Sequence, residues 1–242
     1  DVQLAVNMGC RAILLQKPEV AATMLNTVQQ HVLALATDDW ADIAEFLRRT
    51  ERRAEVKRAT AETDIHVIVD LDGGGDTLVN TGLHFFDHML SQLPHHAGIS
   101  LYCVCKGDLE VDEHHTMEDV AIALGEALRT ALGSKRGIDR YGFVLPMDEC
   151  DAMVTLDFGG RIDFQWDVPF TREYVGYTPT EMFKHVFQSL CAAMQCNLHI
   201  KARGENNHHL VEGVFKAFAR ALRQAIHRNV FSYELPSSKG TL

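Results

Sequence analysis

The chain of 242 residues lacks the features of membrane, secreted and nucleic-acid-binding proteins. It has no apolar run near the roughly 20 residues that a membrane helix needs, and no signal peptide opens the sequence, which begins with Asp1 and not Met. Its 6 cysteines form no Cys-x-x-Cys pair and no disulfide-framework spacing, so free thiols in a reducing cytoplasm are expected. A net charge of -10 argues against a nucleic-acid partner, although it leaves room for a small anionic substrate.

The most informative feature is a repeated motif. The sequence His-His-x-x-Glu occurs twice, 94 positions apart, as His114, His115 and Glu118 and as His208, His209 and Glu212. On a helix, the carboxylate projects from the same surface as both imidazoles. The adjacent imidazoles nevertheless diverge by roughly 100°. Each motif is therefore better suited to give one His to each of two ions than to surround a single ion.

The register of this duplication extends beyond the motifs, because Ala127-Leu128-Arg129 and Ala221-Leu222-Arg223 repeat at the same offset. A further His precedes each motif. Imidazole with carboxylate and no thiolate suits Mn, Fe, Co or a catalytic Zn, and disfavours a structural zinc site. The candidate metal ligands are His88, His114, His115, Glu118, His185, His208, His209 and Glu212.

The first part of the chain differs from the remainder. We predict a helix at residues 1–7, a strand at 12–15, a helix from Pro18 to about Ala36 and another from Trp40 to about Arg49. This pattern has too few strands for a closed core and suggests the end of a truncated domain, residues 1–52. The charged segment 51–62 is expected to connect it to the second domain, residues 53–242.

The second domain reads as two β-β-α-β-α halves, about 53–140 and 141–232, followed by a C-terminal tail. In the first half we predict strands at 65–71, 77–81 (returning from the first) and 99–106, and helices at 85–93 and 116–132. In the second half we predict strands at 151–158, 161–168 and 197–203, and helices at 180–194 and 210–228. This order predicts an internally duplicated α+β fold with helices packed on sheets.

Five segments together resemble the imidazoleglycerol-phosphate dehydratase family over about residues 53–242. They are Glu62-Thr63-Asp64-Ile65, Phe86-Asp87-His88-Met89-Leu90, Asp112 to Asp119, Asn207 to Glu212, and Pro236-Ser237-Ser238-Lys239-Gly240. The resemblance implies two Mn²⁺ ions per active site, a cage of 24 subunits, and active sites completed at subunit interfaces. It also implies a lyase of histidine biosynthesis that dehydrates imidazole glycerol phosphate to imidazole acetol phosphate.

The resemblance carries over to individual positions. All eight candidate ligands match the family's metal residues, and all but His185 are included in our predicted catalytic set. Glu62 matches a glutamate that contacts substrate, and it is our candidate general base. The predicted substrate-binding residues are Glu62, His96, Arg140, Arg161, Lys216, Ser238 and Lys239, of which the arginines, the lysines and the serine match phosphate contacts.

A second resemblance concerns the N-terminus. The segment Asp1-x-x-x-Ala5-x-Asn7-x-Gly9 resembles the last motif of haloacid-dehalogenase-type phosphatases. Some dehydratases of the family carry a histidinol-phosphate phosphatase of this type ahead of the dehydratase. Such a phosphatase needs a nucleophilic Asp near its own N-terminus, and that region is absent from this sequence, so no phosphatase activity is expected.

Two other classes use similar ligands. A two-metal phosphohydrolase would use paired ions to attack a phosphate with a metal-bound water. A di-iron carboxylate bundle of the ferritin type also places Glu and His at helical spacing, but in an all-helical fold. The alternating strand at 65–71 argues against the bundle.

Overall fold

The computed structural model describes residues 2–48, 52–73, 75–142, 145–229 and 234–240. The chain divides into two compact units, Asp1–Thr50 and Glu51–Leu242. The predicted limits at Asp1, Arg49 and residue 232 lie outside the described residues. Within the described residues, no helix combines the length and apolar character needed to cross a membrane.

The first unit consists of α1 (Val2–Met8), β1 (Ala12–Leu15), α2 (Pro18–Met24), α3 (Thr27–Val32), β2 (Leu33–Thr37) and α4 (Trp40–Arg48). The prediction of one helix from Pro18 to Ala36 is wrong. Asn26 begins a new helix through a capping box with Gln29. The following residues then leave the helix to pair in parallel with β1. Leu and Ala are good helix formers, so strand pairing overrides local propensity here.

The first sheet of the second unit contains β3 (Arg53–Ala59), β4 (Thr63–Asp70), β5 (Leu78–Asn80) and β6 (Ser100–Gly107), in the order β3-β4-β6-β5. The prediction that residues 51–62 only connect two domains is wrong, because β3 lies antiparallel to β4 at the edge of this sheet. Its charged residues Arg53, Glu55 and Lys57 are exposed, as edge strands often require.

The prediction that residues 77–81 return along the first strand is wrong, as the short strand β5 shows. This strand does not return along β4 but pairs in parallel with β6. The physical reason is that both edges of β4 are already occupied, by β3 and by β6. The predicted one-sided burial of β4 is confirmed, since Ile65, Val67 and Val69 are all buried.

The second sheet contains β7 (Tyr141–Gly142), β8 (Leu145–Met147), β9 (Cys150–Asp157), β10 (Asp163–Asp167) and β13 (Asn197–Arg203). Its order is β10-β13-β9-β7, with β8 also paired to β9. The strands β4-β6-β5 of the first sheet correspond to β9-β13-β10 of the second. In both triplets, the strand that comes last in the sequence lies between the other two. The duplicated α+β fold is thus confirmed, and the two sheets exclude the ferritin-type bundle. A small hairpin, β11 (Tyr174–Val175) and β12 (Thr178–Pro179), precedes the third helix of this unit.

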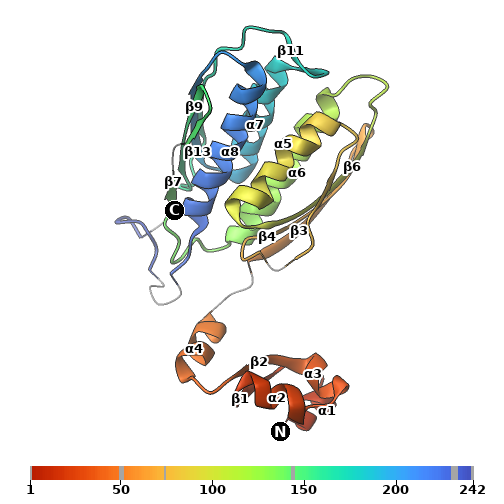
Figure 1. Ribbon diagram of the computed structural model, residues 1–242, viewed down its shortest axis with the longest axis vertical. Coiled ribbons are helices and arrows are strands. Elements are labelled where there is room, and N and C mark those ends of the chain that lie inside the picture. Colours follow the sequence, from red (N-terminus) through yellow and green to blue (C-terminus); the bar gives the residue numbers. More distant parts are fainter. Residues whose placement is uncertain (1, 49–51, 74, 143–144, 230–233, 241–242) are drawn as a thin grey trace. The chain divides into compact units, whose positions relative to one another are not determined.

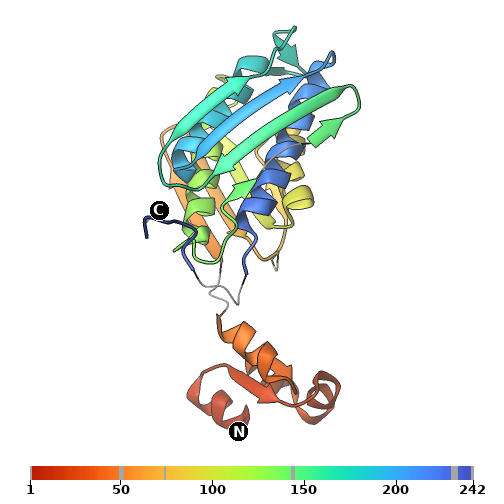
Figure 2. The same ribbon diagram turned by 90° about the vertical axis from the view of Figure 1, so that its left-hand side faces the viewer.

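Four helices fill the space between the two sheets (Figures 1 and 2): α5 (His84–Ala97), α6 (His114–Leu132), α7 (Thr180–Met194) and α8 (Asn207–Ile226). Helix α6 packs on β4, and α8 packs on β9. The other two helices cross between the halves, because α7 packs on α6 and α5 packs on α8. The buried apolar residues of the second unit, from Ala54 to Ile226, form one continuous core. This exchange of helices determines which histidines meet.

Candidate metal and active site

Both His-His-x-x-Glu motifs begin in the first turn of a helix. Helix α6 begins at His114, earlier than the predicted Thr116, and α8 begins at Asn207, earlier than the predicted residue 210. A side-chain oxygen two residues before the first His of each motif accepts a hydrogen bond from that residue's N–H: Asp112 for His114 at 2.8 Å, and Asn206 for His208 at 2.9 Å. Each bond satisfies a backbone N–H at the start of its helix; Asn206 is the N-cap of α8, whereas Asp112 precedes the N-cap residue of α6, Glu113.

The first cluster of possible ligands consists of His114, Glu118 and His185, whose ligand atoms lie within 4.8 Å of one another. His114 Nε2 is 3.6 Å from Glu118 Oε2, and His185 Nε2 is 3.2 Å from Glu118 Oε1. The Nε2 atom of His185 is buried, and although it is close to Glu118 the two make no hydrogen bond of acceptable geometry. A buried nitrogen of this kind is costly unless something binds it. The donor set of two imidazoles and a carboxylate fits a divalent cation.

The second cluster consists of His88, His208 and Glu212. His208 Nε2 is 3.4 Å from Glu212 Oε2, and Lys216 Nζ is 2.9 Å from Glu212 Oε1. Partial burial alone raises the pKa of Glu212, but the hydrogen bond and charge of Lys216, with the nearby imidazoles, outweigh it and lower the pKa. Glu212 is therefore held as the carboxylate, the form that binds metal.

Each cluster combines residues from both halves of the chain. His185 comes from α7 of the second half and joins the first motif, whereas His88 comes from α5 of the first half and joins the second motif. In the sequence, His88 precedes the first motif and His185 precedes the second. Only the packing of α7 on α6 and of α5 on α8 reverses that association.

The second His of each motif points away from the first. The ring centroids of His114 and His115 are 6.2 Å apart with the planes at 77°, and those of His208 and His209 are 6.2 Å apart at 81°. In the described residues neither His115 nor His209 belongs to the two clusters built on the first histidines. The expected divergence of neighbouring imidazoles is therefore present. Metal ligation by His115 and His209 stays a prediction.

Two carboxylates that sequence analysis missed hold these second histidines. His115 Nδ1 is 3.0 Å from Asp108 Oδ2, and His209 Nδ1 is 2.9 Å from Glu149 Oε2. These hydrogen bonds raise the pKa of both imidazoles, and the bond from His209 lowers the pKa of Glu149 to about 2. A carboxylate on Nδ1 orients the ring and leaves Nε2 for a metal. Glu149 directly precedes β9 just as Glu62 precedes β4, a signal visible in the sequence once the strands are paired.

The candidate base Glu62 lies in the turn between β3 and β4, with its side chain 49% exposed. Its Oε1 is 3.9 Å from His115 Nε2. The carboxylate is therefore beside a predicted ligand and open to a small molecule.

The predicted phosphate contacts fall into different environments. Arg140 binds Asp157 through Nε and Nη2, and its Nη1 donates to the carbonyl oxygen of Pro236 at 2.9 Å. This brings the segment carrying Ser238 and Lys239, both exposed, next to Arg140. Burial, and the positive charges of His95, Lys216 and Arg220, lower the pKa of His96. Arg161 is exposed, and among the described contacts its carbonyl accepts from Asn197 at 2.8 Å.

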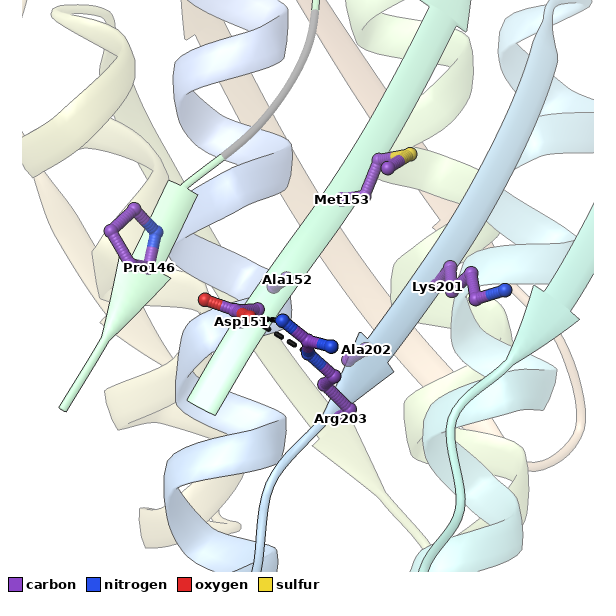
Figure 3. A pocket seen from close by; sticks show the side chains of 7 residues that line it. All are labelled: Pro146, Asp151, Ala152, Met153, Lys201, Ala202 and Arg203. Carbon is purple, nitrogen blue, oxygen red and sulfur yellow. Dashed lines mark hydrogen bonds and ion pairs between the residues drawn. The ribbon is translucent and has the colours of Figure 1, made fainter. Parts of the chain in front are cut away.

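A separate cavity of about 520 Å³ lies on the outer face of the second sheet (Figure 3). An ion pair between Arg203 and Asp151, at 2.6 Å, crosses it beside Met153 and Lys201. None of its lining residues is a predicted site residue. The candidate active site is therefore defined by the two ligand clusters and not by this cavity.

Comparison with known proteins identifies the family. Residues 81–222 match the family described as imidazoleglycerol-phosphate dehydratase. The protein called histidine biosynthesis bifunctional protein HisB in Bacteroides fragilis (strain YCH46) is 57% identical over 242 residues, covering 100% of this chain and 64% of that protein. The protein of the same name in Spirosoma linguale is 50% identical over 250 residues, covering 100% of this chain and 65% of that protein. The chain thus spans slightly less than two thirds of these relatives.

Solved structures agree with this assignment. Imidazoleglycerol-phosphate dehydratase from Staphylococcus aureus is 31% identical with a TM-score of 0.66, and the match covers 73% of this chain and 99% of that one. The enzyme from Pyrococcus furiosus, in complex with (S)-C348, is 31% identical with a TM-score of 0.67, covering 77% and 100%. The resemblance of residues 1–9 to a phosphatase stays a prediction. On these matches, the chain belongs to the imidazoleglycerol-phosphate dehydratase family.

Proposed function

We propose that this chain is a metal-dependent lyase of histidine biosynthesis, which dehydrates imidazole glycerol phosphate to imidazole acetol phosphate. Family membership supports the reaction. The observation that carries the site is the pair of clusters, each with two imidazoles and one carboxylate, at equivalent ends of α6 and α8. A cytoplasmic location fits a chain whose six cysteines are free.

The two clusters would each hold one Mn²⁺ ion, through His114, Glu118 and His185 in one and through His88, His208 and Glu212 in the other. Bound ions supply Lewis-acid stabilisation of the substrate's imidazole and a template that orients it. Lys216 keeps Glu212 ionised for this purpose. Three ligands leave positions open for substrate and for further protein ligands.

His115 and His209 are the candidates for those further ligands. Each has Nδ1 engaged by a carboxylate, and in the described residues each lies outside the two clusters built on His114 and His208. We propose that their Nε2 atoms complete clusters on neighbouring subunits, within a cage of 24 subunits. Active sites would then form only on assembly.

Substrate binding would use the groups around the clusters. Glu62, exposed beside His115, would remove the proton as general base. His96 and Lys216 would flank the second cluster. A guanidinium has five N–H donors, so Arg140 would keep donors for phosphate after binding Asp157 and Pro236. Arg161, Ser238 and Lys239 would add further contacts.

The test is formation of imidazole acetol phosphate by the purified chain, first stripped of metal and then given Mn²⁺. We expect product only with metal. The variant Glu62→Gln should lose about 10²–10⁴-fold in kcat with its metal content unchanged. The matched control Glu19→Gln, at an exposed position in the first unit, should retain full activity.

The competing function is a two-metal phosphohydrolase. It is distinguished in the same reaction, because it would release inorganic phosphate without forming the dehydrated product. Absence of both products from a folded, metal-loaded and assembled chain would remove both proposals.

A further inference from the structure

The turn that carries Glu62 is attached to the first metal-motif helix by a buried carboxylate, Asp119. This residue follows Glu118 on α6 and is only 8% exposed. Its Oδ2 accepts hydrogen bonds from the hydroxyls of Thr63, at 2.6 Å, and Thr60, at 3.4 Å. Its Oδ1 accepts from Nε and Nη2 of Arg58, at 3.1 and 2.9 Å. One carboxylate thus binds the end of β3, the turn and the start of β4.

The backbone of Glu62 is held by the groups that Asp119 fixes. The Glu62 N–H donates to Thr60 Oγ1 at 3.2 Å, and the Thr63 N–H donates to the same oxygen at 3.0 Å. The Glu62 carbonyl accepts from the Asp108 N–H at 3.1 Å. Asp108 in turn binds His115. The position of Glu62 relative to the imidazole is therefore determined through Asp119 on one side and Asp108 on the other.

The second half of the chain lacks this arrangement. Gly213 follows Glu212 where Asp119 follows Glu118. The glutamate before β9, Glu149, is itself bound to His209, whereas Glu62 before β4 has Oε1 3.9 Å from its imidazole. In the described residues, the carboxylate clamp therefore occurs only in the half whose glutamate is free to act on a substrate.

We propose that Asp119 is a positioning residue, which clamps the turn at residues 60–63 on α6 so that the carboxylate of Glu62 faces the reacting carbon. This inference rests on the proposed function, in which Glu62 is the general base. Removing the clamp would leave the ligand clusters in place but allow the base to move. A displacement of about 1 Å can cost on the order of 100-fold in rate.

The test is a double-mutant cycle with Asp119→Asn and Glu62→Gln on the metal-loaded, assembled chain. Asp119→Asn should lower kcat by about 10- to 100-fold with KM and metal content nearly unchanged. In the Glu62→Gln background it should lower kcat by less than about twofold, because the base is already absent. Asp167→Asn, in the exposed pair with Lys201, is the matched control and should leave kcat unchanged.

Two further measurements keep the proposal testable if Asp119→Asn fails to fold. Thr63→Val removes the 2.6 Å hydrogen bond with little change in shape and should reproduce the loss of kcat. Amide hydrogen exchange of residues 60–63 should be faster in either variant, and this measurement does not depend on enzyme activity. Equal losses of kcat with and without Glu62 would overturn the clamp while leaving the dehydratase intact. Full activity of Glu62→Gln would instead overturn the base, and the clamp with it.

Discussion

The same substitution, Gly to Ala, should have opposite effects on stability in α6 and α8. A Cβ at Gly125 of α6 would lie 2.5 Å from Ala193 Cβ and 2.9 Å from the Leu190 carbonyl oxygen, both on α7. A Cβ at Gly213 of α8 would lie 3.7 Å or more from its neighbours, which is ordinary contact. Gly125 is therefore required for the close approach of α6 and α7, and Gly213 is not required for packing.

The expected magnitudes follow from two opposing effects. Alanine inside a helix is more favourable than glycine by about 0.5–1 kcal/mol. Gly213→Ala should gain this amount. At Gly125 the added methyl is about 1 Å too close to α7, and overpacking of this kind costs about 1–3 kcal/mol. Gly125→Ala should therefore lose about 1 kcal/mol net, and the two variants should differ by about 2 kcal/mol.

The assay is urea unfolding followed by circular dichroism, at one protein concentration and with chelator present so that bound metal does not contribute. Gly213→Ala should raise the midpoint and Gly125→Ala should lower it, with equal slopes. The Gly125 variant should also bind metal more weakly, because the α6–α7 contact brings His185 to Glu118. Midpoints that move in the same direction would refute the packing argument.

Two other predictions concern the ligands and the thiols. Metal binding, measured in competition with a chelator, should be weakened about 10- to 100-fold by Asp108→Asn and by Glu149→Gln. Each variant removes the carboxylate that orients the second imidazole of a motif. Unchanged affinity in a variant that keeps its secondary structure would contradict this role. At pH 8, iodoacetamide should modify the exposed Cys10 of the folded chain and leave the five buried cysteines unmodified. Burial raises the pKa of Cys103 to about 12, so at pH 8 this residue stays a thiol and does not form the reactive thiolate. Early labelling of Cys103 in the mass spectrum would show that the fold opens there.

Elements with strong local signals were predictable from the sequence. The helix at residues 180–194 and the strand at 197–203 are found at those residues, because an apolar helical period and strand alternation bounded by short connections specify them locally. The duplicated order of strands and helices follows from the same patterns, whereas the family was inferred from the resemblance of five motif segments.

Two of the strands that were not predicted, β2 and β3, were missed for a different reason. β2 consists of Leu, Ala and Thr, which suit a helix, and β3 carries alternating charges that suit a connection. Each becomes a strand only because an edge of β1 or β4 is available beside it. Strand pairing joins residues far apart in the sequence, so no local window reveals it.

The sequence by itself determined which groups are candidates for the site: imidazoles and carboxylates at a repeated helical spacing, a pattern that predicts divalent-ion ligands. The tertiary structure decided how those groups combine. It brings six of the eight predicted ligands into two clusters, gives His185 to the first motif and His88 to the second, and assigns Asp108 and Glu149 to the remaining histidines. The physical reason is that helix packing, α7 on α6 and α5 on α8, brings together side chains from opposite halves of the chain.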